Sequence, residues 1–93
     1  MQTQAGQAVS LLKALANESR LMILCHLLEE ELSVGELNSR LPLSQSALSQ
    51  HLAVLRRDGL VSTRKAAQTV YYSLRSTEVR TLIATLHSLY CHA

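Results

Sequence analysis

The sequence predicts a mainly α fold of the winged helix-turn-helix type, in which four helices, a β-hairpin and a fifth helix follow one another. Three observations predict it. Apolar residues recur at helical spacing over most of the chain, two short helical segments flank Pro42, and the apolar period changes from about 3.6 to 2 after Gly59. With 93 residues, the chain has the length of one small domain, and we expect a single domain over residues 1–93.

The first two helices are indicated by their apolar faces and by a cap between them. We expect the first helix over residues 5–16, because its apolar residues recur on one face. Asn17 is suited to cap a second helix that runs from Glu18 to about Glu30, and Glu18 complements the positive end of the helix dipole. Residues 21–28 are apolar on most sides, so this helix is expected to lie centrally.

A pair of short helices follows and predicts the helix-turn-helix. Ser33 and Glu36 have the spacing of a capping box, which opens a third helix. Pro42 disfavours helical geometry at the residue before it, so that helix is short. The fourth helix is expected over residues 44–57, and Gly59 is suited to the left-handed conformation that ends it.

The remaining segments predict a wing and a last helix. Residues 60–65 and 70–74 read as two strands, and the second of them alternates with Val70, Tyr72 and Leu74 facing inward. The loop between them, residues 66–69, holds neither glycine nor proline, so its turn type stays open. Ser76 or Thr77 caps a final helix that continues almost to the end of the sequence.

The charge is distributed unevenly along the chain. The formal net charge is only +2, but residues 40–75 carry six cationic side chains against Asp58 alone, a net of +5, and the remainder carries −3. A basic segment inside a nearly neutral protein suits a polyanion. We therefore expect double-stranded operator DNA as a partner; a solvated charged face is the alternative.

The fourth helix supplies the candidate reading residues. Leu48, Leu52 and Leu55 define its buried face, which leaves small hydroxyls and an amide on the outer half. Recognition helices contact bases mainly through their N-terminal half, and Gln50 has the donor and acceptor needed to read adenine. For His51, a phosphate contact and packing against the preceding helix both stay open. The predicted DNA-binding residues are Ser44, Gln45, Ser46, Ser49, Gln50, His51, Arg56, Arg57, Arg64, Lys65, Gln68 and Thr69.

A homodimer is expected because one domain of this size covers little DNA. Specific protein–DNA interfaces bury on the order of 1,000–2,500 Å², and a symmetric dimer presents two recognition helices about one turn of DNA apart. The first and last helices carry more apolar surface than one small domain uses. The predicted dimer residues are Val9, Leu12, Leu82, Ile83, Leu86 and Tyr90.

Other classes of protein find little support. The sequence has no glycine-rich phosphate loop, no pair of catalytic carboxylates and no nucleophile elbow, so we expect no enzyme and no cofactor. No apolar run approaches the roughly 20 residues that span a bilayer, and residues 1–8 lack a signal pattern, so we expect a cytoplasmic protein without a membrane partner. A protein-interaction module with a degenerate helix-turn-helix is the alternative outside DNA binding. By composition alone, Cys25 and Cys91 are buried small hydrophobes.

Several segments of the chain resemble the ArsR/SmtB family of dimeric bacterial regulators. Residues 14–24, 43–52 and 56–61 carry this resemblance, which covers nearly the whole chain. A closer similarity to the HlyU-type, sulfur-responsive branch of the family is carried by residues 31–37, 67–72 and 86–91. The resemblance implies a bacterial, nucleoid-associated transcription regulator.

The resemblance also changes the interpretation of the two cysteines. It implies that a persulfide or an oxidant joins Cys25 and Cys91 as a disulfide or polysulfide bridge, and that the bridge lowers the affinity for operator DNA. Such a bridge would tie the second helix to the last one. His87 lies one turn before Cys91 and favours its thiolate, whereas the sequence shows no comparable neighbour for Cys25, because His26 points about 100° away along the helix.

A metal-responsive repressor is the alternative within the family. The family's third-helix metal site needs a cysteine pair, but residues 31–37 hold no thiol, and Tyr90 stands where the last-helix zinc site has its final ligand. His87, Cys91 and His92 still offer a set of donors to a soft ion. We therefore predict a thiol switch and no resident metal.

Overall fold

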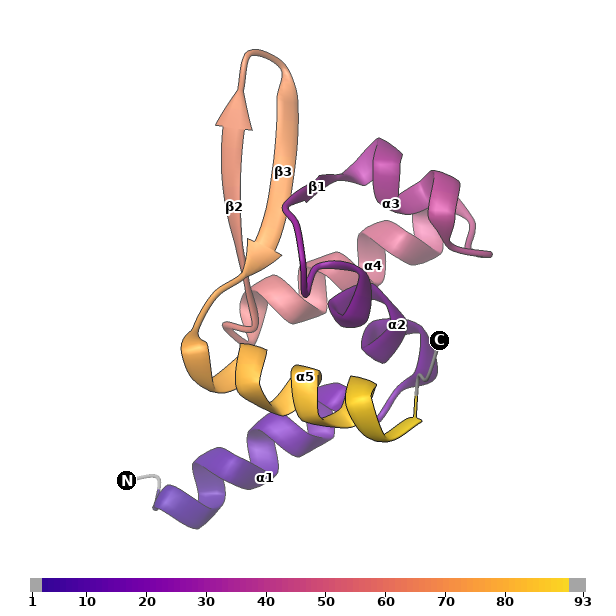
Figure 1. Ribbon diagram of the computed structural model, residues 1–93. Helices are drawn as coiled ribbons and strands as arrows, with labels where there is room; N and C mark the ends of the chain where they lie inside the picture. The colour runs from indigo at the N-terminus through magenta and orange to yellow at the C-terminus, as the bar shows by residue number, and fades with distance from the viewer. Residues whose placement is uncertain (1–2, 91–93) are drawn as a thin grey trace.

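The computed structural model describes residues 3–90, which form five helices and three short strands (Figure 1). The mainly helical winged helix-turn-helix predicted from the sequence is confirmed. None of the helices in this described part is long and apolar enough to cross a membrane. The elements are α1 (Gln4–Leu15), α2 (Glu18–His26), β1 (Leu32–Ser33), α3 (Val34–Arg40), α4 (Gln45–Arg57), β2 (Val61–Ala66), β3 (Thr69–Leu74) and α5 (Thr77–Tyr90).

Helix α2 begins as predicted but ends earlier. The Asn17 side chain accepts a hydrogen bond from the backbone N–H of Arg20 at 3.0 Å, which confirms the expected cap. The helix ends at His26, where the prediction extended it to about residue 30. The backbone tightens there, because Leu28 donates to the carbonyl of Cys25, three residues back. The carbonyl of Leu28 accepts from the Arg80 guanidinium of α5, a contact from a distant part of the chain.

The short strand β1 was not predicted, and it joins the wing to the helix-turn-helix. Leu32 and Ser33 pair with Tyr72 and Tyr71 of β3, so the sheet has the strand order β1-β3-β2. Ser33 also caps α3: its hydroxyl accepts from the Glu36 N–H at 3.1 Å, and the Glu36 carboxylate accepts from the Ser33 N–H at 2.9 Å. The predicted capping box is thus confirmed, with a residue that belongs to strand and cap at once.

Replacing Ser33 with alanine is expected to lower the free energy of unfolding by about 1 kcal/mol, because one donor at the start of α3 loses its acceptor. Urea denaturation measures the loss. Ser39→Ala in the same helix is the matched control, since the exposed Ser39 hydroxyl only donates to the Glu36 carbonyl, and we expect a change within about 0.5 kcal/mol. Equal losses in the two variants would contradict a capping role for Ser33.

The turn before the wing and the wing itself follow the predicted pattern with a shift of one residue. Gly59 has a φ of +76°, as expected for the residue that ends α4. Strand β2 begins at Val61 and β3 already at Thr69, so that only two residues form the hairpin loop. The first of them, Ala67, adopts a φ of +56°, a conformation usually left to glycine.

The core lies between α2, α4, α5 and the inner face of the sheet. Helix α2 is central, as predicted, because Ile23 and Leu24 are completely buried. The predicted buried face of α4 is confirmed by its three leucines. The fully buried large side chains are Ile23, Leu24, Leu27, Leu32, Leu37, Leu48, Leu52, Leu55, Val61 and Ile83.

Candidate nucleic-acid interface

The N-terminal half of α4 presents the predicted reading residues on its outer face. Ser44 is the cap of this helix, because its hydroxyl accepts from the Ala47 N–H at 3.1 Å. That hydroxyl also lies 3.4 Å from the hydroxyl of Ser46. His51 is half-buried at the edge of the apolar stripe. The exposed residues of this half are Ser44, Gln45, Ser46, Ser49 and Gln50.

A groove of about 490 Å³ lies between α4 and the wing. We call it the helix–wing groove; its lining residues are Ser49, Ala53, Arg56, Arg57 and Tyr72. The structure therefore brings the predicted residues Ser49, Arg56 and Arg57 together in one place. Tyr72 was predicted only as an inward-facing strand residue and is added to the candidate interface by the structure.

The two faces of the wing carry different cations. Lys65 pairs with Val70 and therefore shares its face of the hairpin with Tyr72, two residues further along β3. Arg64 pairs with Tyr71 and lies on the opposite face. Gln68 and Thr69 are exposed at the tip. Of the two predicted basic residues of the wing, only Lys65 is on the face of Tyr72.

Arg64 is held in an ion pair across the sheet. Its guanidinium donates to both carboxylate oxygens of Glu31, at 2.6 to 3.2 Å, and lies 4.8 Å from the centre of the Tyr71 ring. These hydrogen bonds lower the pKa of Glu31 below its usual 4.5 and raise the pKa of Arg64. The sequence predicted that Arg64 contacts a phosphate. To do so, Arg64 has to give up its ion pair with the Glu31 carboxylate.

The cations at the end of α4 are in different situations. The Arg57 guanidinium donates to the Asp58 carboxylate at 3.2 Å, which partly neutralises it. Arg56 is exposed and forms no ion pair with any residue between 3 and 90. Arg56 is therefore the cation that is most available to an anion in the helix–wing groove.

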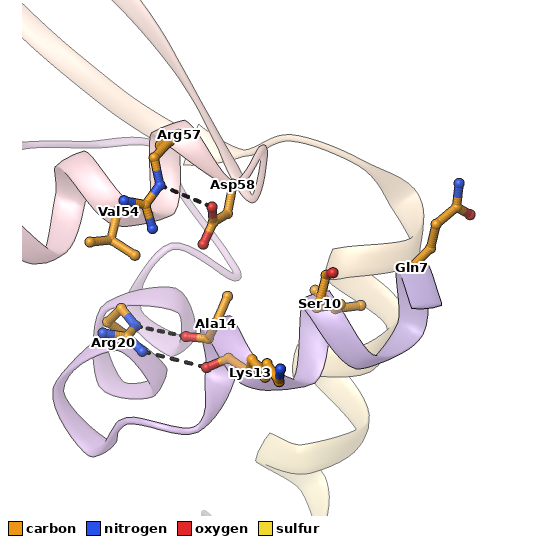
Figure 2. A pocket seen from close by; sticks show the side chains of 9 residues that line it. Gln7, Ser10, Lys13, Ala14, Arg20, Val54, Arg57 and Asp58 are labelled. Atoms are coloured by element: carbon orange, nitrogen blue, oxygen red, sulfur yellow. Dashed lines mark hydrogen bonds and ion pairs between the residues drawn. The ribbon is translucent and has the colours of Figure 1, made fainter. Parts of the chain in front are cut away.

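A second cavity, of about 630 Å³, lies between α1, the start of α2 and the end of α4 (Figure 2). Arg20 reaches from α2 to the end of α1, where its guanidinium donates to the carbonyls of Ala14 at 2.7 Å and Lys13 at 3.5 Å. The Lys13 carbonyl also accepts from the Ala16 N–H at 3.3 Å, so Arg20 adds a second donor there and supplies a donor to the Ala14 carbonyl at the helix end. Arg57 lines this cavity as well as the helix–wing groove.

The predicted dimer residues divide into exposed and buried ones. On α1, Val9 is 48% and Leu12 56% exposed, and on α5 Tyr90 is 79% exposed. Leu82 and Leu86 are half-buried. Ile83 needs a correction: it is 0% exposed, because it faces the core of its own chain, and it has no surface to offer to a second copy. Leu89, 58% exposed, extends the exposed apolar surface of α5 and was not predicted.

Cys25 lines a polar cavity of about 230 Å³, here called the Cys25 cavity. The thiol-bearing residue is half-buried on α2 and packs against the core. His87 of α5 lines the same cavity, a neighbour that sequence spacing did not reveal. The predicted partner Cys91, like His92, lies outside the described residues. The other residues that line the cavity are His26, Leu28, Glu29, Glu30 and Arg40.

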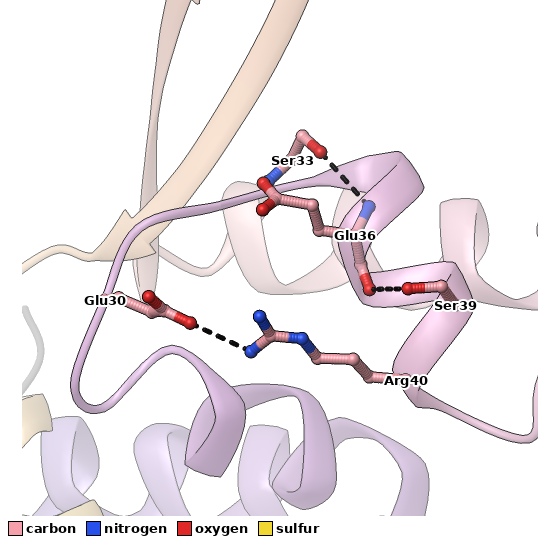
Figure 3. A network of polar contacts seen from close by, with 5 residues as sticks. All are labelled: Glu30, Ser33, Glu36, Ser39 and Arg40. Carbon is pink, nitrogen blue, oxygen red and sulfur yellow. Dashed lines mark hydrogen bonds and ion pairs between the residues drawn. The ribbon is translucent and has the colours of Figure 1, made fainter.

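The wall of the Cys25 cavity includes a contact to the helix-turn-helix. Arg40, the last residue of α3, donates to the Glu30 carboxylate at 2.9 Å (Figure 3). Glu30 lies in the segment that leaves α2. Within residues 3–90, no three or more histidine, cysteine or acidic side chains are grouped to hold a metal ion.

Comparison with known proteins assigns this arrangement to a family. The profile of the bacterial regulatory proteins of the arsR family matches residues 17–63. The chain is 70% identical over 93 residues to the transcriptional activator HlyU of Vibrio cholerae, which covers all of this chain and 86% of that protein. It is 42% identical over 91 residues to a biofilm growth-associated repressor of Agrobacterium fabrum, covering 98% of this chain and 78% of that protein. The structure of reduced HlyU from Vibrio cholerae matches with a TM-score of 0.91 and 72% identity, covering 95% of this chain and 93% of that one.

Proposed function

The chain belongs to the arsR family of bacterial regulatory proteins and is a DNA-binding transcriptional regulator, and we propose that a thiol switch formed by Cys25 and Cys91 controls its affinity for operator DNA. Its relatives are transcriptional regulators and not enzymes. The observation that carries the proposal is the Cys25 cavity, because it gives a half-buried cysteine polar surroundings that include His87. The form of HlyU described as reduced supports a redox-dependent state in this branch of the family.

DNA is bound by a homodimer in this proposal. Regulators of the family bind DNA and usually form homodimers, and the exposed apolar residues of α1 and α5 support an interface through these helices. Helix α4 enters the major groove and the hairpin tip approaches the adjacent minor groove. The interface residues are Val9, Leu12, Leu82, Leu86 and Tyr90.

The bridge forms by thiolate chemistry that balances with either class of inducer. With hydrogen peroxide, one thiolate attacks an oxygen and becomes a sulfenic acid while hydroxide leaves and takes up a proton to form water. The second thiol then displaces a further water from the sulfenic acid to form the disulfide. With a persulfide, one thiolate takes the outer sulfur and releases the carrier thiol, and the second thiol then displaces hydrogen sulfide. A second persulfide lengthens the bridge by one sulfur atom.

The route from the thiols to DNA passes through α2. The bridge would restrain α2 against the end of α5, and Arg40 connects the segment after α2 to α3 of the helix-turn-helix. A shift of α2 therefore changes the position of α3 relative to the partner protomer. The two recognition helices of the dimer must enter major grooves one turn of DNA apart. A small rotation of one protomer against the other therefore lowers the affinity for the operator.

Operator binding before and after inducer treatment tests the proposal. The operator is selected from random duplexes with reduced protein, and fluorescence anisotropy follows its binding after one equivalent of cysteine persulfide or hydrogen peroxide. We expect a 5- to 150-fold loss of affinity, the usual range of allosteric coupling, and recovery with dithiothreitol. Intact mass identifies the bridge by the loss of two hydrogens, with or without added sulfur.

Cys25→Ser and Cys91→Ser are expected to bind the operator like the reduced protein and to ignore the inducer. A response that persists in either variant would show that the two thiols do not form the switch. Addition of Zn²⁺ to the reduced protein separates the metal-responsive alternative, because only that mechanism releases DNA with both cysteines reduced.

A further inference from the structure

The helix–wing groove has the shape and the donors of an anion site. Ser49 and Ala53 are small residues one helical turn apart on α4, so they leave the side of the groove formed by the helix open. Arg56, Arg57 and Tyr72 line the same groove. Two arginines and two hydroxyl-bearing residues, Ser49 and Tyr72, thus line the groove where helix α4 faces the wing.

The backbone and ring of Tyr72 are held in place, whereas its hydroxyl forms no hydrogen bond with the described residues. Its backbone lies in the central strand β3, paired with Leu32 on one side and with Thr63 on the other, and its ring packs against the core. Among residues 3–90, every buried side-chain polar atom has a hydrogen-bond partner, whereas the Tyr72 hydroxyl has none in this part of the chain. The hydroxyl therefore reaches the surface, on a residue that lines the groove.

The charge of the groove favours an anion over a base edge. Arg56 carries its charge without an ion-pair partner among the described residues, and the Asp58 carboxylate offsets only Arg57. Guanidinium groups donate and cannot accept, and a tyrosine hydroxyl readily donates. A phosphodiester, which only accepts, matches this set of groups, whereas base edges present donors as well.

We infer that the helix–wing groove binds a phosphate of the operator backbone and that the Tyr72 hydroxyl donates a hydrogen bond to it. The inference rests on the proposed placement of α4 in the major groove and is independent of the thiol switch. Tyr72 becomes a DNA-binding residue that also ties the contact to the central strand of the sheet. Its hydrogen bond positions the backbone and carries no sequence information.

Tyr72→Phe tests the inference, because it removes the hydroxyl and keeps the ring. Anisotropy titrations use reduced protein, the selected operator and a scrambled duplex of equal length. We expect about tenfold weaker binding to both duplexes, as for the loss of one hydrogen bond to a charged group, and an unchanged dependence on salt. Arg56→Gln should weaken both duplexes and also reduce the salt slope by about 0.9.

Tyr71→Phe is the matched control, because Tyr71 directly precedes Tyr72 in β3 and lies on the opposite face, beside Arg64. We expect it to bind both duplexes within twofold of the unchanged protein. The inference is overturned if Tyr72→Phe also stays within twofold, or if it loses affinity for the operator alone, which would indicate a base contact. The Tyr72→Phe protein is also treated with inducer. Its response to the inducer depends on the cysteines only, so a failed Tyr72 contact and a failed thiol switch give different results.

Discussion

Replacing Ile83 with alanine is expected to lower the free energy of unfolding by about 3 kcal/mol, within the range of 2–5 kcal/mol for large-to-small changes in cores. Ile83 is completely buried and belongs to the same apolar cluster as Ile23 and Leu24 of the central helix. Shortening it leaves a cavity between α5 and α2 that rigid helices cannot close. The expected loss in the free energy of unfolding therefore comes from the core of one chain and not from contacts between two chains.

Urea denaturation at two protein concentrations separates this effect from dimer formation. Ile83→Ala should lower the midpoint by a similar amount at both concentrations. Leu12→Ala is the control, because Leu12 is 56% exposed on α1, and it should mainly change how the midpoint depends on concentration. A loss below 1 kcal/mol for Ile83→Ala, or one seen only in dilute protein, would place Ile83 at the interface after all.

Replacing Gln50 with alanine is expected to weaken operator binding by a factor of about 5 to 150, because a bidentate amide–adenine contact contributes roughly 1–3 kcal/mol of discrimination. Gln50 is exposed on the N-terminal half of α4, near the cap at Ser44. Binding to a scrambled duplex should change little, since the phosphate contacts are retained.

Selection of operators with the Gln50→Ala protein provides the measurement that complements affinity. The preference for adenine should relax at one position of each half-site. Gln7→Ala is the matched control, because Gln7 is a glutamine exposed on α1, and it should retain both affinity and preference. Equal losses on operator and scrambled duplex would contradict base recognition by Gln50.

The parts of the fold that were predicted from sequence are those with local causes. The capping box at Ser33, the break at Pro42 and the left-handed Gly59 each depend on residues within one turn of chain. Strand β1 has only two residues, too few to show a period. Just after the end of α2, the Leu28 carbonyl accepts a hydrogen bond from Arg80, which lies far away in the sequence, and local spacing could not indicate this contact.

In the candidate site too, the features with local causes were predicted from sequence, and those that depend on distant residues were not. Helical spacing on α4 identified the outer residues correctly as exposed, because a single helix determines them. Spacing on β3 assigned Tyr72 to the inner face but did not show that this face continues into a groove beside α4. The ion pair of Arg64 on β2 with Glu31, the residue before β1, reaches across the central strand β3, whereas charge counting along the chain treated Arg64 as available.

Ser33 belongs both to strand β1 and to the cap of α3, and this has a consequence for the spacing of the contacts to operator DNA. Because one residue both pairs with the wing and caps α3, the hairpin and the helix-turn-helix are joined without a flexible linker. If α4 and the hairpin bind DNA as proposed, we expect a constant offset between their major-groove and minor-groove contacts within each half-site. We therefore expect that a base pair inserted within a half-site would abolish recognition. A change in the distance between half-sites would instead be accommodated by rotation of one protomer against the other.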